Sequence, residues 1–599
     1  MKTNKYTKVL TGCMLGAFLL AFNSCKEGLD YENENTIVPD AVWKDAAMIN
    51  GFFNDIHGGL NPGWQYDAAS SDEGIDGVLQ MSTYLRGMIT VDNAHVEMDY
   101  TYIDKINFFL KNLEEVTASV MPEEEKSLLE GQAKFWRAWT YWGMVKRIGG
   151  VPLILEPQDA TDKESLYHER NKTSECVAQI LKDLDDAIAV LPGRYTDESK
   201  DYGRITKAAA MAFKGKVLLY YASPLFNPNN DKSRWETAYA ANKDAIDFLD
   251  KEGYGLYPDY KQLWYDERNK EVIMMNQYFY PGHAMGNFPS PAVGNGNQPL
   301  LGTLLSFPLK DGSYLTIDKD KLKNDSKYNE AFLEDFYLNR DDRFYTSFHF
   351  GGIPYPCEEL KPGFTKDKTL WNVAEWNETE GKYDELLGKY FGFIGNLYIS
   401  GFSQIKGVDQ SLTFDAHSNG QTDWIEIRYA EVLMNMGECA NELGKTEEAL
   451  KVLYDIRKRA NIEAGADGHF GIKATSVSDI REQYIVERQA EFVYEGKRFE
   501  DLRRWKRYDI MNNHGHRHGL TLVLKPGAPV PTFSETIWDP EVRKNFRVDY
   551  IDNVDGDPGY YFDLDLNHWF YALKPGQISQ SMGKLEQNVE WGGTFDPLQ

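Results

Sequence analysis

Residues 428–460 read RYAEVLMNMGECANELGKTEEALKVLYDIRKRA, and they carry the clearest structural pattern in the chain. Apolar residues recur three and four positions apart, which is the spacing of one helix face. Gly437 and Gly444 lie seven apart, Ala449 follows five positions later, and Leu453 follows four after that. Small residues are needed where two helices cross closely, and Gly444 falls in the turn between them. The stretch therefore predicts two helices packed against each other.

This arrangement of small residues resembles that of a tetratricopeptide repeat. A weaker copy at 208–247 has Gly215 and Tyr221 on its first helix, and Ala238 and Ala245 on its second. A single repeat of this kind is unstable alone. We therefore expect the helix pairs to stack on one another.

Helical periodicity also recurs in several blocks between residues 41 and 251. It fades from about residue 253, where Gly, Pro, Asn and aromatic residues become frequent. Loops this long inside a compact protein are usually functional. The expected fold is mostly α, with a helical-repeat scaffold, a large irregular loop-rich insertion and an irregular tail. The expected helices lie at 41–60, 98–118, 123–148, 173–191, 204–222, 233–251 and within 423–460.

Composition excludes several classes of protein. A length of 599 residues is enough for several domain-sized units, and a hydrophobic fraction of 42% is enough for a core. The net charge of −27 and the lack of a dense Lys/Arg block argue against a nucleic-acid partner. Three cysteines, Cys176, Cys357 and Cys439, follow the N-terminal segment. They cannot all pair, and two fall in helical patterns, so we expect buried thiols.

The N-terminus predicts a membrane anchor. Three lysines precede an uncharged apolar run at 9–22, which is the layout of a secretory signal peptide and is too short to span a bilayer. Ser24 before Cys25 looks like a bacterial lipoprotein signal, in which the cysteine becomes the lipidated first residue, although Phe22 stands where leucine is usual. The alternative is an ordinary signal peptide cut elsewhere. Several acyl chains on one cysteine anchor a protein firmly, so we expect Cys25 to hold the chain at a membrane outside the cytoplasm.

Two further segments carry a family resemblance. EGQAKFWRAWTYWGMVKRIGGVPLI stands at 130–154 and IREQYIVERQAEFVYEGKRFEDLRRWKR at 480–507. Together they resemble the signature segments of the SusD/RagB family of Bacteroidetes outer-membrane nutrient-binding lipoproteins. The ending LEQNVEWGG at 585–593 is similar to that family's usual end, although Val589-Glu590 stands where Pro-Gly is common.

The resemblance implies a lipid-anchored protein exposed on the surface of the outer membrane. Such a protein captures oligosaccharide and caps a TonB-dependent, SusC-like transporter, without chemistry of its own. Acidic residues that follow Cys25 would send the lipoprotein to the outer face. The implied division of the chain is signal peptide 1–24, lipidated tether 25–40, N-terminal helical region 41–252, irregular insertion 253–422 and C-terminal region 423–599.

The signature segments need not touch a ligand. Glu487, Glu491 and Glu495 repeat at four-residue spacing beside Arg488 and Arg498, so they can pair along one helix or with a neighbour. We expect a structural role for both segments.

Aromatic loops supply the candidate binding residues. Saccharides stack their C–H faces on Trp and Tyr rings while Arg, Asp and Asn side chains hold neighbouring hydroxyls. Trp64, Tyr84 and Arg86 are the first choices, and for each ring, packing under a loop is the alternative. The full candidate set is Trp64, Tyr66, Asp72, Tyr84, Arg86, Asn93, Tyr280, Phe288 and Trp371.

No cofactor is expected, and two weaker metal patterns stay open. His514, His516 and His518 alternate in one loop, where imidazoles could bind metal or face solvent. The run DNVDGDPG at 552–559 is reminiscent of a calcium loop, yet Ile551 occupies the first ligand position of the EF-hand pattern. A structural Ca²⁺ of another kind remains an alternative there.

No nucleophile elbow, phosphate loop or zinc-helix motif appears in the sequence. The alternative functions are a surface glycoside hydrolase acting through carboxylates, and a purely structural lid on the transporter. The sequence does not name the nutrient, and a peptide stays open beside glycans.

Overall fold

The computed structural model describes most of the chain after residue 38. The described residues are 39–64, 68–75, 80–159, 161–162, 164–279, 281–283, 297–371, 373–377, 379–380, 382–385, 400–413, 416 and 420–599.

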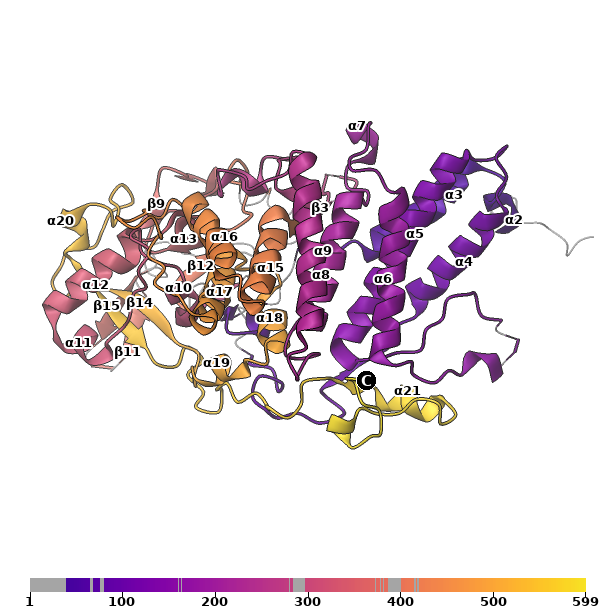
Figure 1. Cartoon of the computed structure of the whole chain (residues 1–599). Helices are drawn as coiled ribbons and strands as arrows, with labels where there is room; N and C mark the ends of the chain where they lie inside the picture. The colour runs from indigo at the N-terminus through magenta and orange to yellow at the C-terminus, as the bar shows by residue number, and fades with distance from the viewer. Residues whose placement is uncertain are drawn as a thin grey trace, which may run out of the picture.

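Long helices form one half of the molecule and stand side by side (Figure 1). They pack in the order α4, α5, α6, α8, α9, α15, α16, so α15 lies on α9 although about 180 residues separate them in sequence. The expected stacking of helix pairs is therefore confirmed. The long helices are α3 (Ala46–Leu60), α4 (Thr101–Glu115), α5 (Glu123–Ile148), α6 (Thr173–Val190), α8 (Lys207–Ala222), α9 (Lys232–Lys251), α15 (Tyr429–Glu442), α16 (Thr446–Arg459) and α17 (Val477–Glu491).

The small residues of 428–460 do what their spacing predicts. A Cβ at Gly437 would lie 2.0 Å from the Tyr484 hydroxyl and 3.0 Å from the Val452 Cβ, so α15, α16 and α17 can approach only because that side chain is missing. Gly444 has φ +76° in the turn between α15 and α16. The start of this region differs from the expected helix, because Trp424–Arg428 form strand β13 against β3 (Val272–Asn276).

The irregular half contains more helix than expected. Its longest helix, α12 (Ser326–Leu338), begins where the Asp325 carboxylate accepts hydrogen bonds from the N–H groups of Lys327 and Tyr328. Phe332 and Phe336 lie one turn apart and are both buried. The shorter helices are α2 (Pro39–Val42), α7 (Glu198–Asp201), α10 (Leu301–Ser306), α11 (Lys319–Asn324), α13 (Asp342–Ser347), α18 (Arg498–Arg504), α19 (Tyr508–Asn512), α20 (Pro540–Arg543) and α21 (Pro575–Gln580).

Strands are short and form small sheets. The largest sheet has the order β11-β10-β14-β15, with β10 parallel to β14 and the other two pairs antiparallel. The remaining sheets have two strands each in the described residues. The strands not yet bounded are β1 (Gly74–Ile75), β2 (His95–Val96), β4 (Gln298–Pro299), β5 (Phe348–Phe350), β6 (Ile353–Pro354), β7 (Glu359–Lys361), β8 (Phe364–Thr365), β9 (Thr369–Leu370), β10 (Ala374–Asn377), β11 (Lys382–Glu385), β12 (Phe402–Gln404), β14 (Gly519–Leu524), β15 (Phe546–Ile551) and β16 (Ala572–Leu573).

The C-terminal tail returns to the N-terminal helices. Strand β16 pairs in parallel with β2, and Thr173 at the start of α6 donates its hydroxyl to the Pro597 carbonyl at 2.7 Å. In Figure 1 the tail runs along the lower ends of the helices. This return places residue 571 beside the end of α5, because the Tyr571 N–H donates to the Arg147 carbonyl.

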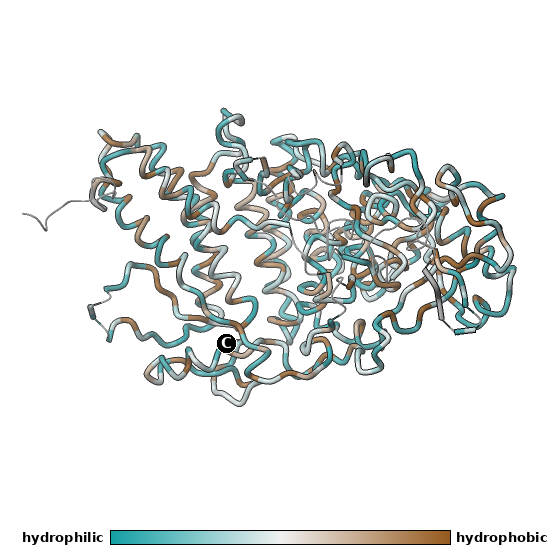
Figure 2. Tube along the Cα trace, turned by 180° about the vertical axis from the view of Figure 1, so that it is seen from behind, coloured by the Kyte–Doolittle hydropathy of each residue, from teal (hydrophilic) through white to brown (hydrophobic). Residues whose placement is uncertain are grey.

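The three later cysteines are buried and unpaired, as expected. In Figure 2 the long helices alternate hydrophobic and hydrophilic segments along their length. Among the described residues, no helix has the combination of length and apolar character needed to cross a bilayer.

Candidate ligand-binding cavity

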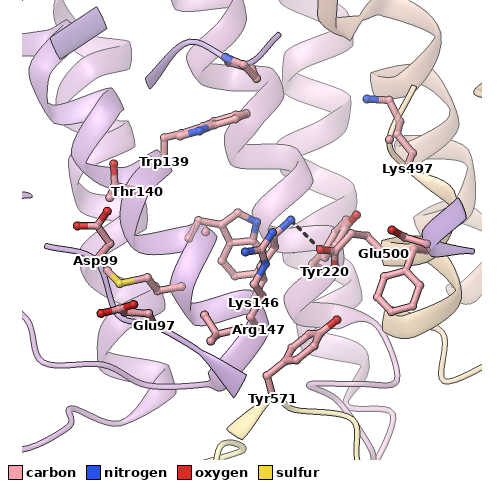
Figure 3. A pocket seen from close by; sticks show the side chains of 18 of the residues that line it. Glu97, Asp99, Trp139, Thr140, Lys146, Arg147, Tyr220, Lys497, Glu500 and Tyr571 are labelled. Atoms are coloured by element: carbon pink, nitrogen blue, oxygen red, sulfur yellow. Dashed lines mark ion pairs between the residues drawn. The ribbon is translucent and has the colours of Figure 1, made fainter. Parts of the chain in front are cut away.

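A cavity of about 860 Å³ opens between the helices and the C-terminal tail (Figure 3). We call it the α5 cavity, because residues 139–147 of α5 form one of its walls. The segment 93–99, helix α8, residues 495–500 and Tyr571 of the tail form the others. Its volume lies in the range of about 300–1,000 Å³ that is usual for ligand pockets.

Aromatic rings supply much of the cavity wall. The half-buried ring of Trp139 packs on Phe213 with 4.7 Å between ring centroids. Tyr84 stacks on Tyr571 at 5.3 Å with an interplanar angle of 26°, and both rings are half-buried. Partly exposed rings held by other rings offer fixed flat faces, and such faces suit the C–H side of a sugar ring.

Charged groups line the same cavity, and most of them are paired. Lys146 contacts Glu500 at 3.0 Å, the pair drawn dashed in Figure 3. Lys216 and Lys497 both contact the buried carboxylate of Glu431, at 3.0 and 2.9 Å. These pairs hold several long side chains in fixed positions around the cavity, where they can meet ligand hydroxyls.

Burial strengthens the coupling between these charges. Burial alone would raise the pKa of Glu500, but the charges of Lys146, Arg503 and Arg147 outweigh it and lower that pKa to about 2. Burial lowers the pKa of the Lys146 ammonium, although the Glu500 carboxylate opposes that shift. Glu500 is therefore an anion throughout the neutral range.

The end of α5 is fixed by two arginines, one of them, Arg503, from a distant part of the chain. Arg503 donates to the carbonyls of Lys146 at 2.7 Å and Arg147 at 3.1 Å. Arg170 donates to the Ile148 carbonyl at 2.6 Å. Carbonyls in the last turn of a helix have no partner within the helix. Here these side chains satisfy them, and Gly149 turns the chain away with φ +80°.

Of the candidates from the sequence, Tyr84 and Asn93 line the α5 cavity. Asn93 is exposed and closes its own turn, since its side chain bonds the Thr90 N–H and the Met88 carbonyl. Arg86 does not line the cavity, and its guanidinium lies 4.9 Å from the centre of the Tyr560 ring.

Three other candidates are buried in the protein. Trp64 is 7% exposed, donates to the Thr422 carbonyl at 2.9 Å and packs against Trp264 and Trp424. Asp72 is 1% exposed and pairs with Arg498 at 2.8 Å.

Trp371 is 2% exposed and stacks on Phe546 at 5.2 Å. Like Trp64 and Asp72, it leaves almost no surface for a ligand, so packing under loops accounts for all three. Tyr66, Tyr280, Phe288 and Cys25 lie outside the described residues.

The cavity also contains residues that are not among the candidates predicted from the sequence. Trp139, Lys146 and Arg147 belong to the first signature segment, which we expected to be structural throughout. Its residues Trp136 and Arg137 are indeed buried, and Arg137 pairs with Asp183 at 2.7 Å. No local signal separated Trp139 from the other rings of α5, because Phe135, Trp136, Tyr141 and Trp142 are all buried.

The second signature segment is largely structural, but its residues 495–500 also line the α5 cavity, which was not expected from the sequence. Its acidic and basic residues are buried in ion pairs, with Glu487 on Arg457, Glu491 on Arg428 and Arg488 on Asp501. None of these side chains reaches the surface.

In both candidate metal patterns, side chains that could bind a metal contact protein groups instead. His516 and His518 bond backbone carbonyls, and His514 contacts Asp72 at 3.4 Å. In the run 552–559, Asp555 pairs with the buried Arg517. Among the described residues, no group of three or more His, Cys, Asp or Glu side chains could hold a metal ion.

The family model described as SusD family matches residues 235–591, and one described as starch-binding associating with outer membrane matches residues 67–219. SusD-like protein P38 of Formosa agariphila is 24% identical over 443 residues, which are 70% of this chain and 73% of that protein.

Solved structures share the fold over nearly the whole chain. A SusD-like protein of Bacteroides fragilis has a TM-score of 0.68 at 24% identity and covers 92% of this chain and 98% of its own. A SusD-like carbohydrate-binding protein of the same species has a TM-score of 0.66 at 20% identity, covering 91% and 99%. Because the SusD family model matches more than half of its 599 residues, this chain belongs to the SusD family.

Proposed function

We propose that the chain binds an oligosaccharide in the α5 cavity, without changing it chemically. The observation that carries the proposal is the combination of Trp139, Tyr84 and Tyr571 with fixed charged side chains in one cavity of about 860 Å³. Rings and charged hydrogen-bonding groups together are what a saccharide needs from a binding site. The description of one structural neighbour as a carbohydrate-binding protein and the starch-binding family model at 67–219 support it.

The test is calorimetric titration of the chain from residue 26 onward against plant, host and microbial glycans. Reducing-end release is measured in the same samples. We expect binding of one glycan class without release. Release of sugar by the purified protein would show that it is a hydrolase. If the protein bound none of the glycans tested, the proposal would be contradicted.

The variant Trp139→Leu tests the site itself. Leucine keeps an apolar contact with Phe213 but removes the flat face, so we expect affinity to fall by about tenfold or more. Trp538→Leu is the matched control, since Trp538 is 43% exposed and does not line the cavity. Equal affinities of Trp139→Leu and wild type would place the ligand elsewhere. Thermal unfolding of both variants checks that each is folded.

We propose further that Cys25 is lipidated, that the chain faces outward on the outer membrane, and that it delivers the glycan to a SusC-like TonB-dependent transporter. The lipoprotein-type start and the family description that mentions the outer membrane support this. Full-length protein should fractionate with outer membranes and co-purify with a TonB-dependent barrel. Cys25→Ala should abolish the membrane association. Wild-type protein found in the soluble fraction would contradict the lipid anchor. Wild-type protein that is recovered from the membrane without any barrel would contradict the transporter partner.

A further inference from the structure

One charge in the α5 cavity has no partner among the described residues. Arg147 is exposed, and its guanidinium makes no hydrogen bond or ion pair with any residue in the described part of the chain. Among the described residues that line the cavity, every other Lys, Arg, Asp or Glu side chain has a contact. Lys146, Lys216 and Lys497 each hold a carboxylate.

The cavity carboxylates are also engaged elsewhere. Glu97 pairs with Lys574 at 2.7 Å. Asp99 accepts the Thr101 N–H at 2.9 Å at the start of α4, where a helix end favours negative charge. Glu426 and Glu495 are held by Trp424 and by Arg428. None of them contacts Arg147. Glu500 feels the charge of Arg147 but forms its ion pairs with Lys146 and Arg503, so the hydrogen-bond donors of the Arg147 guanidinium remain for a ligand.

Other side chains already bond the carbonyls at the end of α5, so Arg147 is not needed to cap this helix. A basic side chain in the last turn of a helix often bonds the free carbonyls there. Here Arg503 and Arg170 bond the carbonyls of residues 146–148. The same bonds fix the backbone from which the Arg147 side chain projects into the cavity (Figure 3).

The surroundings of Arg147 define what could bind there. The Tyr571 N–H donates to the Arg147 carbonyl at 2.9 Å, and the Tyr571–Tyr84 ring pair lines the same cavity as the Arg147 side chain. Guanidinium groups bind carboxylate and sulfate through paired hydrogen bonds. A sugar ring lying on Tyr571 could therefore present an acidic substituent to Arg147.

We propose that the ligand of the α5 cavity is an acidic saccharide, whose carboxylate or sulfate binds Arg147. This rests on the proposed function and narrows it to a class of glycan. The net charge of −27 repels anions from the protein as a whole, so selectivity comes from this local contact.

The experiment uses glycans in pairs that differ only in charge. The pairs are polyuronate oligosaccharides with their methyl esters, sialylated glycans with their desialylated forms, and sulfated oligosaccharides with their desulfated forms. The uronate and sialate pairs report a carboxylate, and the sulfated pair reports a sulfate. Calorimetry with wild-type protein should find an acidic member bound about tenfold or more tightly than its neutral counterpart.

Arg147→Gln should remove that preference while neutral counterparts bind as before, and Arg147→Lys should restore part of it. Arg268→Gln removes the same charge from an exposed arginine outside the cavity and should change neither affinity. Binding confined to neutral glycans, or a preference that survives Arg147→Gln, would overturn this inference and leave the proposed function standing. Binding of no glycan at all would overturn both.

Discussion

Two regions of this molecule are rich in charge, and they differ in access to water. Around Arg428, Glu271 and Glu491 lie 2.7 Å and Glu495 2.9 Å from its guanidinium, and all four side chains are at most 1% exposed. In the α5 cavity, the side chains of Lys146 and Glu500 keep 23% and 17% of their exposure, and Arg147 is exposed. The first region can only hold the fold together, whereas the second has charge left for a ligand.

The physical reason is the cost of burying ions. A buried charge is tolerated only when it is paired and hydrogen-bonded. The network around Arg428 meets that condition, and Arg459 and Arg343 bring further cations to Glu271 and Glu491. An exposed arginine such as Arg147 needs no partner in the free protein, because water solvates it.

The largest expected effect comes from breaking the sealed network. Arg428→Met keeps most of the side-chain volume but leaves three buried carboxylates short of a cation. We expect the free energy of unfolding to fall by about 3–5 kcal/mol. Denaturant unfolding followed by circular dichroism measures it. A loss below about 1 kcal/mol would show that the network is not a structural element.

Two control variants sharpen this comparison. Arg147→Met removes an exposed charge that has no partner in the described part of the chain, and Lys451→Met removes half of an exposed ion pair with Asp455 on α16. Exposed charges contribute little to stability, so each change should stay within about 0.5 kcal/mol. A large loss in Arg147→Met would indicate a structural role for that side chain.

A smaller effect is expected at Asp423, a buried carboxylate outside the network. One of its oxygens accepts the Tyr278 N–H at 2.9 Å, and the other is buried with no hydrogen-bond partner among the described residues. Burial raises the pKa of Asp423 from 3.8 to about 7, and the neighbouring Glu267 adds to that shift.

This pKa makes stability fall as the pH rises. The folded protein keeps a proton that the unfolded chain releases near pH 4, so the contribution is complete below pH 4 and is lost as the pH rises toward 7. Asp423→Asn keeps the acceptor for Tyr278 and removes the titration. At pH 8 the free energy of unfolding of Asp423→Asn should exceed that of the wild type by about 1–2 kcal/mol. Thermal unfolding of the wild type and of Asp423→Asn from pH 4 to 8 measures this difference. If the stability of the two proteins changed with pH in the same way, Asp423 would not have the raised pKa.

Local patterns were enough for the helices, because periodicity and capping act within one segment. The expected helix at 123–148 matches α5 residue for residue, and Gly437 marks a real close approach. Helix α12 was missed, because it stands in a region where irregular residues surround its short apolar pattern.

The binding site was less accessible to the same reasoning. Tyr84 and Asn93 do line the cavity, but the rings of Trp64 and Trp371 turned inward. A loop tryptophan looks the same in sequence whether it faces a ligand or a core, because its burial depends on segments far along the chain. For Trp64 those segments are residues 264 and 424.

The sequence by itself determined the helical repeats, the family resemblance and the buried thiols, because each rests on residues close together in the chain. The anchor at Cys25 stays a prediction. Only the tertiary structure decided which charges are sealed and which are free. The carbonyls of Arg147 and Ile148 accept hydrogen bonds from Arg503 and Arg170, and the Arg147 carbonyl also accepts the Tyr571 N–H. The contacts of Arg503 and Tyr571 join residues far apart in sequence, so Arg147 is distinguished from other surface arginines only once the chain is folded.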